Sequence, residues 1–370
     1  MPSAEPVRIL AVIGTRPEAI KMAPVVHALE RAGGFSVFVC ATGQHRELLT
    51  QTLELVRLRV DCNLDVMVHD QSLAGLTARL FDALDPIVAR ERPGWILVQG
   101  DTTTAAVGSM VGFYRRVRVG HVEAGLRTDD LHQPFPEELN RRVADLCADL
   151  CFAPTDLARH HLLREGISAQ RVHVTGNTIV DAVLDIASRP YDESRGPLAP
   201  VPRGTRWVLV TTHRRENFGE PLARICAAVD QLAERFAGSA HFIVPVHPNP
   251  NVGAAVSRAL TRSNCSVIPA LGYRDFIHVL SRSVLALSDS GGVQEEAPTF
   301  GVPVLVLREK TERPEGVDAG VARLVGTDTT RIVAEASAIL AAGGPRRAMT
   351  NPYGDGRAAE RIASILRSDS

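Results

Sequence analysis

Short apolar runs rich in valine and isoleucine alternate along this chain with longer stretches of helical periodicity. A continuously apolar run of about five residues is typical of a strand buried on both faces, and helices between such strands indicate a parallel sheet. The pattern therefore predicts an α/β fold. Strands are expected at Arg8–Ile13, Ser36–Cys40, Trp95–Gln99, Val117–His121, Leu150–Ala153, Val172–Thr175, Trp207–Thr212, His241–Val246, Ser266–Pro269, Val284–Ser288 and Val302–Leu307.

A polar, proline-rich run at Pro190–Pro202 divides these strands into two sets and is expected to be an exposed connector. The chain has 370 residues, which is more than one hydrophobic core usually supports. We therefore expect two doubly wound α/β domains of similar size, with a cleft between them.

Polar motifs follow several of the predicted strands directly. In open α/β sheets, ligands bind beyond the carboxyl ends of the strands, so this placement favours binding chemistry over ordinary loops. The motifs are Gly14–Pro17, Gly100–Thr104, Glu123, His213–Asn217 and Ser290–Gly292.

The segment Leu287–Pro298 is the most informative of these motifs. It predicts the end of a strand, a Ser-Gly-Gly turn that lets a ligand approach the backbone, and the start of a helix whose N–H groups suit a phosphate. Glu295 and Glu296 add negative charge, so at least one of them is expected to face other groups, such as ribose hydroxyls. A turn capped by Asp289 or Ser290 is the alternative. The chain contains neither GxGxxG nor GxxxxGK[ST], which disfavours a nicotinamide cofactor and a nucleoside triphosphatase.

Composition narrows the class of protein. Apolar residues make up 45% and charged residues 22%, and the net charge of -1 gives no reason to expect nucleic acid or membrane as a partner. The six cysteines form no CxxC pair, which indicates free thiols in a reducing compartment and no metal site. With no signal-peptide pattern and no run of membrane-spanning length, a cytoplasmic location is expected.

Several side chains in the first half of the chain suit acid–base or phosphate chemistry. Arg16 is expected to project from a strand–helix turn, where arginine suits phosphate, and Lys21 lies one turn further along. Asp101 is either a catalytic acid or a helix cap. Glu123 is expected to be partly buried, which would raise its pKa and suit proton transfer, unless it forms a salt bridge with Arg127.

Further candidates lie later in the chain. Glu137 and Arg141 are spaced for an exposed ion pair on one helix. His213 is a proton shuttle, a phosphate contact or a structural loop histidine. Arg313 is a second cation for phosphate or part of a solvated loop.

Taken together and in this order, these motifs resemble those of the non-hydrolysing UDP-N-acetylglucosamine 2-epimerases. The resemblance covers nearly the whole chain. It is carried by GTRPEAIKMAP (14–24), GDTTT (100–104), HVEAGLRT (121–128), PFPEELNR (134–141), TGNT (175–178), THRRENFG (212–219), HPNP (247–250), SDSGGVQEEAP (288–298) and TERPEG (311–316).

The resemblance implies a fold of the glycosyltransferase-B type, in which two Rossmann-like domains flank an active-site cleft. The expected domains are residues 1–176, with the final helix at 356–370 packing back on them, and residues 177–355, which would bind UDP. It further implies reversible conversion of UDP-N-acetylglucosamine to UDP-N-acetylmannosamine by a cytoplasmic homodimer that needs no cofactor, and a role in polysaccharide biosynthesis.

The family's functional positions fall on specific residues here. The catalytic positions match Asp101, Glu123, Glu137 and His213. The positions that bind the UDP-sugar match Arg16, Lys21, Arg141, Phe276, Ser290, Gly291, Gly292, Glu296 and Arg313. Gln44, Arg214 and His247 resemble part of a regulatory substrate site of some bacterial members.

Two positions depart from the family pattern. Leu271 replaces a glutamine that lies near the base in some members, and Glu47 stands where certain members have glutamine. The second departure argues against activation by substrate.

The chemistry explains why such groups are needed. The proton at C2 of the sugar is barely acidic, and it becomes more acidic if UDP leaves C1 first or concurrently. Elimination would give 2-acetamidoglucal and UDP, and re-addition after protonation on the other face would give the epimer. The alternatives are a hydrolysing epimerase that releases N-acetylmannosamine and UDP, a glycosyltransferase of the same fold, and a nucleotide-sugar binding module without catalysis.

Overall fold

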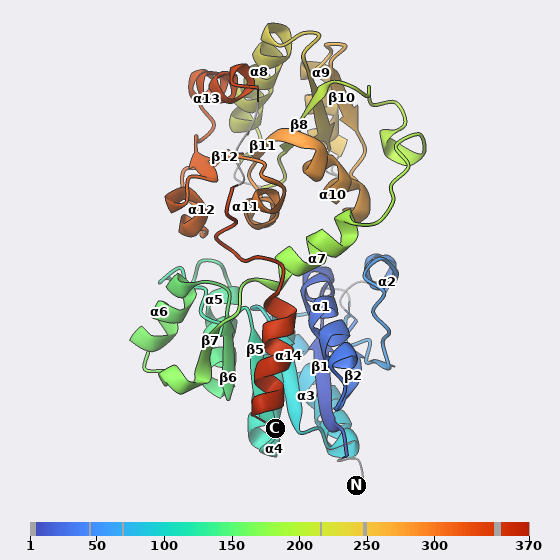
Figure 1. Ribbon diagram of the computed structural model, residues 1–370, viewed down its shortest axis with the longest axis vertical. Coiled ribbons are helices and arrows are strands. Elements are labelled where there is room, and N and C mark those ends of the chain that lie inside the picture. The colour runs from blue at the N-terminus through green and yellow to red at the C-terminus, as the bar shows by residue number, and fades with distance from the viewer. Residues whose placement is uncertain are drawn as a thin grey trace. The chain divides into compact units, whose positions relative to one another are not determined.

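The chain divides into two units, each built around its own parallel sheet, in the computed structural model (Figure 1). Unit 1 comprises Met1–Ala182 and Tyr353–Ser370, and unit 2 comprises Val183–Pro352. The structure describes residues 5–43, 46–68, 70–214, 217–246, 250–343 and 349–369. Two doubly wound α/β units of this kind are the fold class that the hydrophobic pattern predicted.

Unit 1 contains a seven-stranded sheet with the order β3-β2-β1-β4-β5-β6-β7. Its strands are β1 (Val7–Ile13), β2 (Phe35–Ala41), β3 (Cys62–Asn63), β4 (Trp95–Gln99), β5 (Arg118–Val122), β6 (Leu150–Ala153) and β7 (Val172–Val174). Its helices are α1 (Arg16–Ala32), α2 (Arg46–Leu55), α3 (Leu73–Glu91), α4 (Thr103–Arg115), α5 (Glu137–Cys147), α6 (Asp156–Arg164), η1 (Ala169–Arg171), α7 (Thr178–Ala187), which runs on into unit 2, and α14 (Ala358–Ser368).

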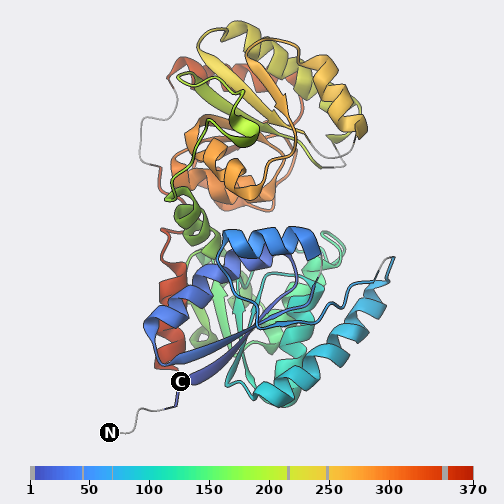
Figure 2. The same ribbon diagram turned by 90° about the vertical axis from the view of Figure 1, so that its right-hand side faces the viewer.

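The helices of unit 1 cover both faces of the sheet. Right-handed crossovers leave β1 and β4 in opposite directions, so α1 and α4 lie on opposite faces (Figure 2). The C-terminal helix α14 packs against α1, where the Arg367 side chain donates to the carbonyl oxygen of Gly33 at 2.9 Å. Asp181 accepts from Ala359 N at 2.9 Å and so caps the start of α14. Burial raises the pKa of Asp181 to about 6.

Unit 2 contains a six-stranded sheet with the order β10-β9-β8-β11-β12-β13. Its strands are β8 (Arg206–Thr211), β9 (Ala240–Pro245), β10 (Cys265–Ile268), β11 (Ser283–Ser288), β12 (Val304–Val306) and β13 (Ala322–Leu324). Its helices are η2 (Gly196–Leu198), α8 (Glu220–Arg235), α9 (Pro250–Ala259), α10 (Tyr273–Arg282), α11 (Gly291–Glu296), η4 (Ala297–Phe300), α12 (Pro314–Asp318) and α13 (Thr329–Ala341).

The structure corrects two local expectations. Strands β3 and β13 were not predicted, because two or three residues give too short a run for a hydrophobic pattern. The proline-rich run at Pro190–Pro202 is not simply exposed. Leu198 and Val201 are buried in the core of unit 2, and Tyr191 stacks on His278 with ring centroids 3.9 Å apart.

Each sheet has one point where the strand order reverses direction. This point lies between β1 and β4 in unit 1 and between β8 and β11 in unit 2. Loops at the carboxyl ends of such neighbouring strands diverge and leave room for a ligand. Within the described residues, no helix is both long and apolar enough to span a membrane.

Candidate functional site

The loops that follow β1 and β4 meet at the reversal point of unit 1. Thr102, and not Asp101, is the N-cap of α4, because its side chain accepts from Ala105 N at 3.0 Å. The capping alternative for Asp101 is therefore wrong, and its carboxylate is available for another role. Arg16 is the exposed first residue of α1.

A buried acid, Glu18, ties these two loops together. Its carboxylate accepts from the backbone N–H groups of Gly14 at 3.1 Å and Thr15 at 2.6 Å, and from the Thr15 hydroxyl at 2.7 Å. The Thr102 hydroxyl donates to its other oxygen at 2.9 Å. Burial, which outweighs these hydrogen bonds, raises the pKa of Glu18 to about 7. Sequence reasoning missed Glu18, although its spacing from Thr15 is the signature of a capping box.

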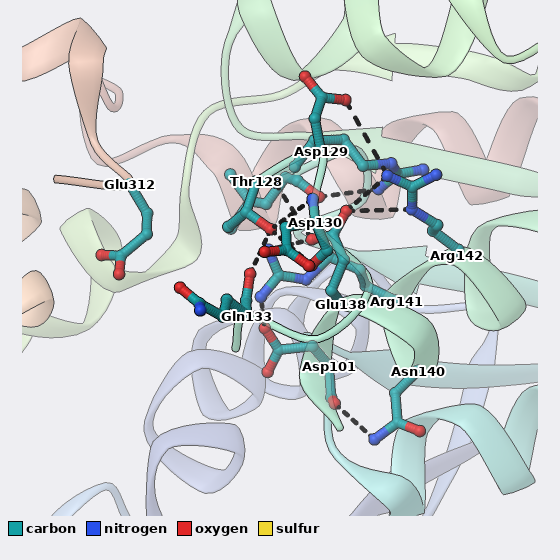
Figure 3. Close-up of polar contacts among 12 residues, drawn as sticks. Asp101, Thr128, Asp129, Asp130, Gln133, Glu138, Asn140, Arg141, Arg142 and Glu312 are labelled. Carbon is teal, nitrogen blue, oxygen red and sulfur yellow. Dashed lines mark hydrogen bonds and ion pairs between the residues drawn. The ribbon is translucent and has the colours of Figure 1, made fainter. Parts of the chain in front are cut away.

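Asp101 is held by two residues of α5. The Arg141 guanidinium forms an ion pair with its carboxylate, and Asn140 donates to its carbonyl oxygen at 3.0 Å (Figure 3). Arg141 also lies 3.4 Å from Glu138, which binds Arg142 at 2.8 Å. The expected partner Glu137, at the half-buried start of α5, is thus replaced by Asp101 and Glu138 in the ion pairs of Arg141.

Glu123 pairs with Lys21 and not with Arg127. Its Oε2 atom lies 2.5 Å from Lys21 Nζ, and both side chains are largely buried. Glu123 adopts a left-handed backbone conformation with φ of 69°, which is costly for a residue with a side chain. Both its own N–H and that of Ala124 donate to the carbonyl oxygen of Phe152 at 3.1 Å, which fixes this conformation.

Arg127 belongs instead to a buried charge cluster with His121, Asp145 and Glu165. The His121 ring binds Asp145 through Nδ1 at 2.6 Å and the carbonyl oxygen of Gly100 through Nε2 at 2.7 Å. Arg127 binds Asp145 at 2.8 Å and Glu165 at 2.6 Å. Although burial acts to raise it, the pKa of Asp145 lies below its ordinary value because of the charges on His121 and Arg127. No sequence pattern pointed to this cluster, whose members come from separate elements.

In unit 2, His213 is held at the end of β8 by Asp289, which follows β11. The Asp289 carboxylate accepts from the backbone N–H groups of His213 at 3.1 Å and Arg214 at 3.0 Å, and from the Asn217 amide at 2.9 Å. His213 Nδ1 lies 3.1 Å from the same carboxylate, which leaves Nε2 on the far side of a half-exposed ring. Burial opposes ionisation of Asp289, yet bonds from His213 and its neighbours hold its pKa below the usual range.

The Ser290–Gly292 turn begins α11 next to this pair. Neither glycine has a positive φ, so the turn does not require glycine for its backbone shape. Around Gly291 and Gly292 there is open space instead, since a Cβ atom on either would meet no atom closer than 3.8 Å. The Arg214 guanidinium lies beside Gly291, at 4.0 Å from that position, although the resemblance assigned Arg214 to a regulatory site.

The remaining candidates of unit 2 surround α11. Arg313 forms an ion pair with the buried Glu295, and Glu296 accepts from the Tyr273 hydroxyl at 2.7 Å. Phe276, on α10, is partly buried and lies 6.4 Å from the Tyr273 ring, nearly parallel to it. The two glutamates of the motif thus have different partners, a cation for Glu295 and a hydroxyl for Glu296.

Two candidates of the regulatory site, Gln44 and His247, lie outside the described residues. Among the residues that the structure does describe, no group of histidine, cysteine and acidic side chains is arranged to hold a metal ion.

Comparisons with known proteins agree with this arrangement. A family model described as UDP-N-acetylglucosamine 2-epimerase matches residues 27–367. The UDP-N-acetylglucosamine 2-epimerases of Salmonella typhimurium and Escherichia coli K12 are each 45% identical to the chain, over 98% of it and over 98% and 99% of their own lengths. A crystal structure of UDP-GlcNAc 2-epimerase from Neisseria meningitidis bound to UDP-GlcNAc superimposes with a TM-score of 0.85 at 37% identity, covering 98% of this chain and all of that one. These findings confirm the resemblance on which the sequence analysis relied.

Proposed function

This chain belongs to the UDP-N-acetylglucosamine 2-epimerase family, and we propose that it inverts C2 of its UDP-sugar by elimination and re-addition of UDP, without releasing free sugar. In the first step, a carboxylate removes the C2 proton and the C1–O bond breaks, so that its electron pair leaves with UDP. The intermediate is 2-acetamidoglucal. Protonation of C2 on the opposite face and return of UDP to C1 then give UDP-N-acetylmannosamine.

Unit 1 supplies the acid–base groups in this proposal. Asp101 and Glu123 follow the neighbouring strands β4 and β5, and Glu137 starts α5, whose next turn carries the Arg141 that binds Asp101. Glu123 carries the proposal, because a strained backbone conformation beside a buried Lys21 is costly and is typical of functional sites. Arg16 and Lys21 would bind the substrate from the same edge of the sheet.

Unit 2 supplies the groups for the leaving diphosphate. The open backbone of Ser290–Gly292, the ring of His213 and the Arg313 guanidinium are suited to bind phosphate oxygens and to stabilise charge that develops during elimination. Glu296 would bind the ribose, and Phe276 would lie beside the uracil.

Solvent exchange at C2 tests the mechanism. If the reaction runs in D₂O, the epimerised product should carry deuterium at C2, as measured by NMR. Retention of the original hydrogen would contradict the proposal. The same samples separate the hydrolysing alternative, because that reaction would release free N-acetylmannosamine in step with UDP.

Substitution of the three acids tests their roles. Asp101→Asn, Glu123→Gln and Glu137→Gln should each lower kcat at least about a hundredfold while UDP affinity, measured by calorimetry, changes little. Asp85→Asn is a matched control for Asp101→Asn, because Asp85 also pairs with an arginine, Arg115, but on the exposed surface. Normal turnover of any one acid variant would remove that residue from the catalytic set.

We also propose that the protein acts as a homodimer in the cytoplasm. Support for the dimer comes from α4 and α5, which pack together and carry exposed apolar side chains at Phe113, Tyr114, Leu139 and Leu146. The six cysteines, all free thiols, suit a reducing compartment.

A further inference from the structure

The two bonds of the buried His121 ring define its protonation state. Nε2 faces the carbonyl oxygen of Gly100 at 2.7 Å, and a carbonyl oxygen only accepts hydrogen bonds, so Nε2 carries a proton. Nδ1 faces Asp145 at 2.6 Å. The ring is therefore either an imidazolium beside a carboxylate or a neutral imidazole beside a carboxylic acid.

The surroundings of Asp145 favour the carboxylate. Arg127 binds the second oxygen of Asp145 at 2.8 Å, and the N–H of Gly125 donates to that oxygen at 3.3 Å. Each of these donors stabilises the ionised form of the acid. A carboxylate on Asp145 leaves the second proton on His121.

The charge balance of the cluster leads to the same assignment. His121, Asp145 and the side chain of Arg127 are essentially inaccessible to solvent, and Glu165 is about three-quarters buried. Two acids then face two cations if His121 is charged, whereas a neutral ring beside an ionised Asp145 would leave an unbalanced negative charge in the interior. Unbalanced buried charge is strongly unfavourable.

This cluster lies directly behind the candidate catalytic residues. Gly100, whose carbonyl oxygen is bound by His121, immediately precedes Asp101 and has a positive φ of 72°. His121 is also two residues before Glu123 on the same strand end. One rigid ring is thus linked to the backbone of both acids.

We propose that His121 is a permanently protonated positioning residue, which holds the Gly100 carbonyl and so orients Asp101 and Glu123. The inference rests on the proposed roles of these two acids. His121 itself does not touch substrate, and Asp145 and Arg127 serve to keep the ring charged and fixed.

The protonation state can be measured in the unmodified chain. Histidine labelled with ¹⁵N in its ring should give one signal, among the twelve histidines, in which both nitrogens stay protonated up to about pH 9, whereas ordinary histidines lose a proton near pH 6.5. His121→Gln assigns that signal by its absence. If every histidine has an unprotonated ring nitrogen at about pH 9, the inference is overturned.

Kinetics of Asp145→Asn test the positioning role. The amide keeps a partner for His121 but removes the negative charge, and we expect kcat to fall about tenfold to a hundredfold while KM changes less than about twofold. His241→Gln is a matched control, because His241 is also a buried strand histidine but binds Ser266 at 2.8 Å, and it should keep normal kinetics.

The two proposals fail in different ways. If folded Asp145→Asn keeps normal kcat while Asp101→Asn is inactive, His121 is only a structural residue and the proposed function stands. If Asp101→Asn and Glu123→Gln are both active, the catalytic assignment fails, and the positioning role falls with it whatever the ¹⁵N signals show.

Discussion

Single carboxylates have two different tasks in this chain, and their burial separates the tasks. Asp101 and Glu123 each pair with one cation at the edge of the sheet. Glu18, Asp145 and Asp289 are buried and accept several N–H or O–H bonds, most of them from residues beside a candidate site. The second group fixes loops and rings, so its removal should affect both stability and turnover.

Asp289→Asn is expected to weaken unit 2 and its site together. The amide would turn an N–H group toward the N–H donors of His213 and Arg214, so we expect a loss of about 3–5 kcal/mol in the free energy of unfolding. Turnover should fall because His213 loses its partner. Urea unfolding and steady-state kinetics measure both effects.

Asp328→Asn provides the control for this prediction. Asp328 is the N-cap of α13 and accepts from Arg331 N at 2.8 Å, a task that asparagine performs equally well. Equal effects of the two substitutions would show that the bonds to Asp289 are not specifically important.

Helix starts are the elements that build the site in unit 1. Helix α1 begins with a capping box of Thr15 and Glu18, and α4 begins with Thr102. Since Thr102 also donates to Glu18, the two helix starts at the reversal point of the sheet are joined by one carboxylate. This bond keeps the loop before Arg16 and the loop containing Asp101 in a fixed relation.

Glu18 should also make stability depend on pH. Burial raises its pKa to about 7 in the folded chain, against an ordinary value of 4.5. Between these values the folded chain binds more protons than the unfolded chain, so this group lowers the free energy of unfolding as the pH rises, by an amount of order 3 kcal/mol. Above about pH 7 the loss is complete.

Glu18→Gln tests this dependence because glutamine does not ionise. Relative to wild type, the variant should gain stability between about pH 5 and pH 8, as measured by urea unfolding at both values. Glu335→Gln, which alters an ion pair with Arg323, is the control and should show a constant difference. A constant difference for Glu18→Gln as well would contradict the raised pKa.

At the scale of the whole molecule, one apolar surface of unit 1 remains to be explained. Phe113 at the end of α4 is 63% exposed and Leu146 near the end of α5 is 70% exposed. Exposed apolar side chains on adjacent helices are typical of surfaces that a second copy covers. The proposed homodimer would bury them.

A double substitution, Phe113→Glu with Leu146→Glu, should convert a dimer to a monomer. Charges placed in an apolar interface remain without partners, so association should weaken by at least about a thousandfold, as measured by sedimentation at varied concentration. Leu73→Glu, at an exposed position that starts α3, should leave the dimer intact. A dimer that persists in the double variant would place the interface elsewhere.

The sequence by itself determined the α/β class, the positions of the longer strands and the identity of the motifs. These features depend on local periodicity and on residue type, which a chain carries before it folds. The polar motifs at strand ends, including Gly100–Thr104 and Ser288–Gly292, were recognisable for the same reason.

The tertiary structure alone decided which of these groups meet. Asp289 binds His213 across 76 residues of sequence, and Asp101 pairs with Arg141 across 40, because β8 lies beside β11 and because α5 lies beside α4. The partners of Glu123 and Arg127 were interpreted wrongly from their closeness in sequence. Strand order and burial choose partners among many acids and arginines of the same kind, and neither is written in local periodicity.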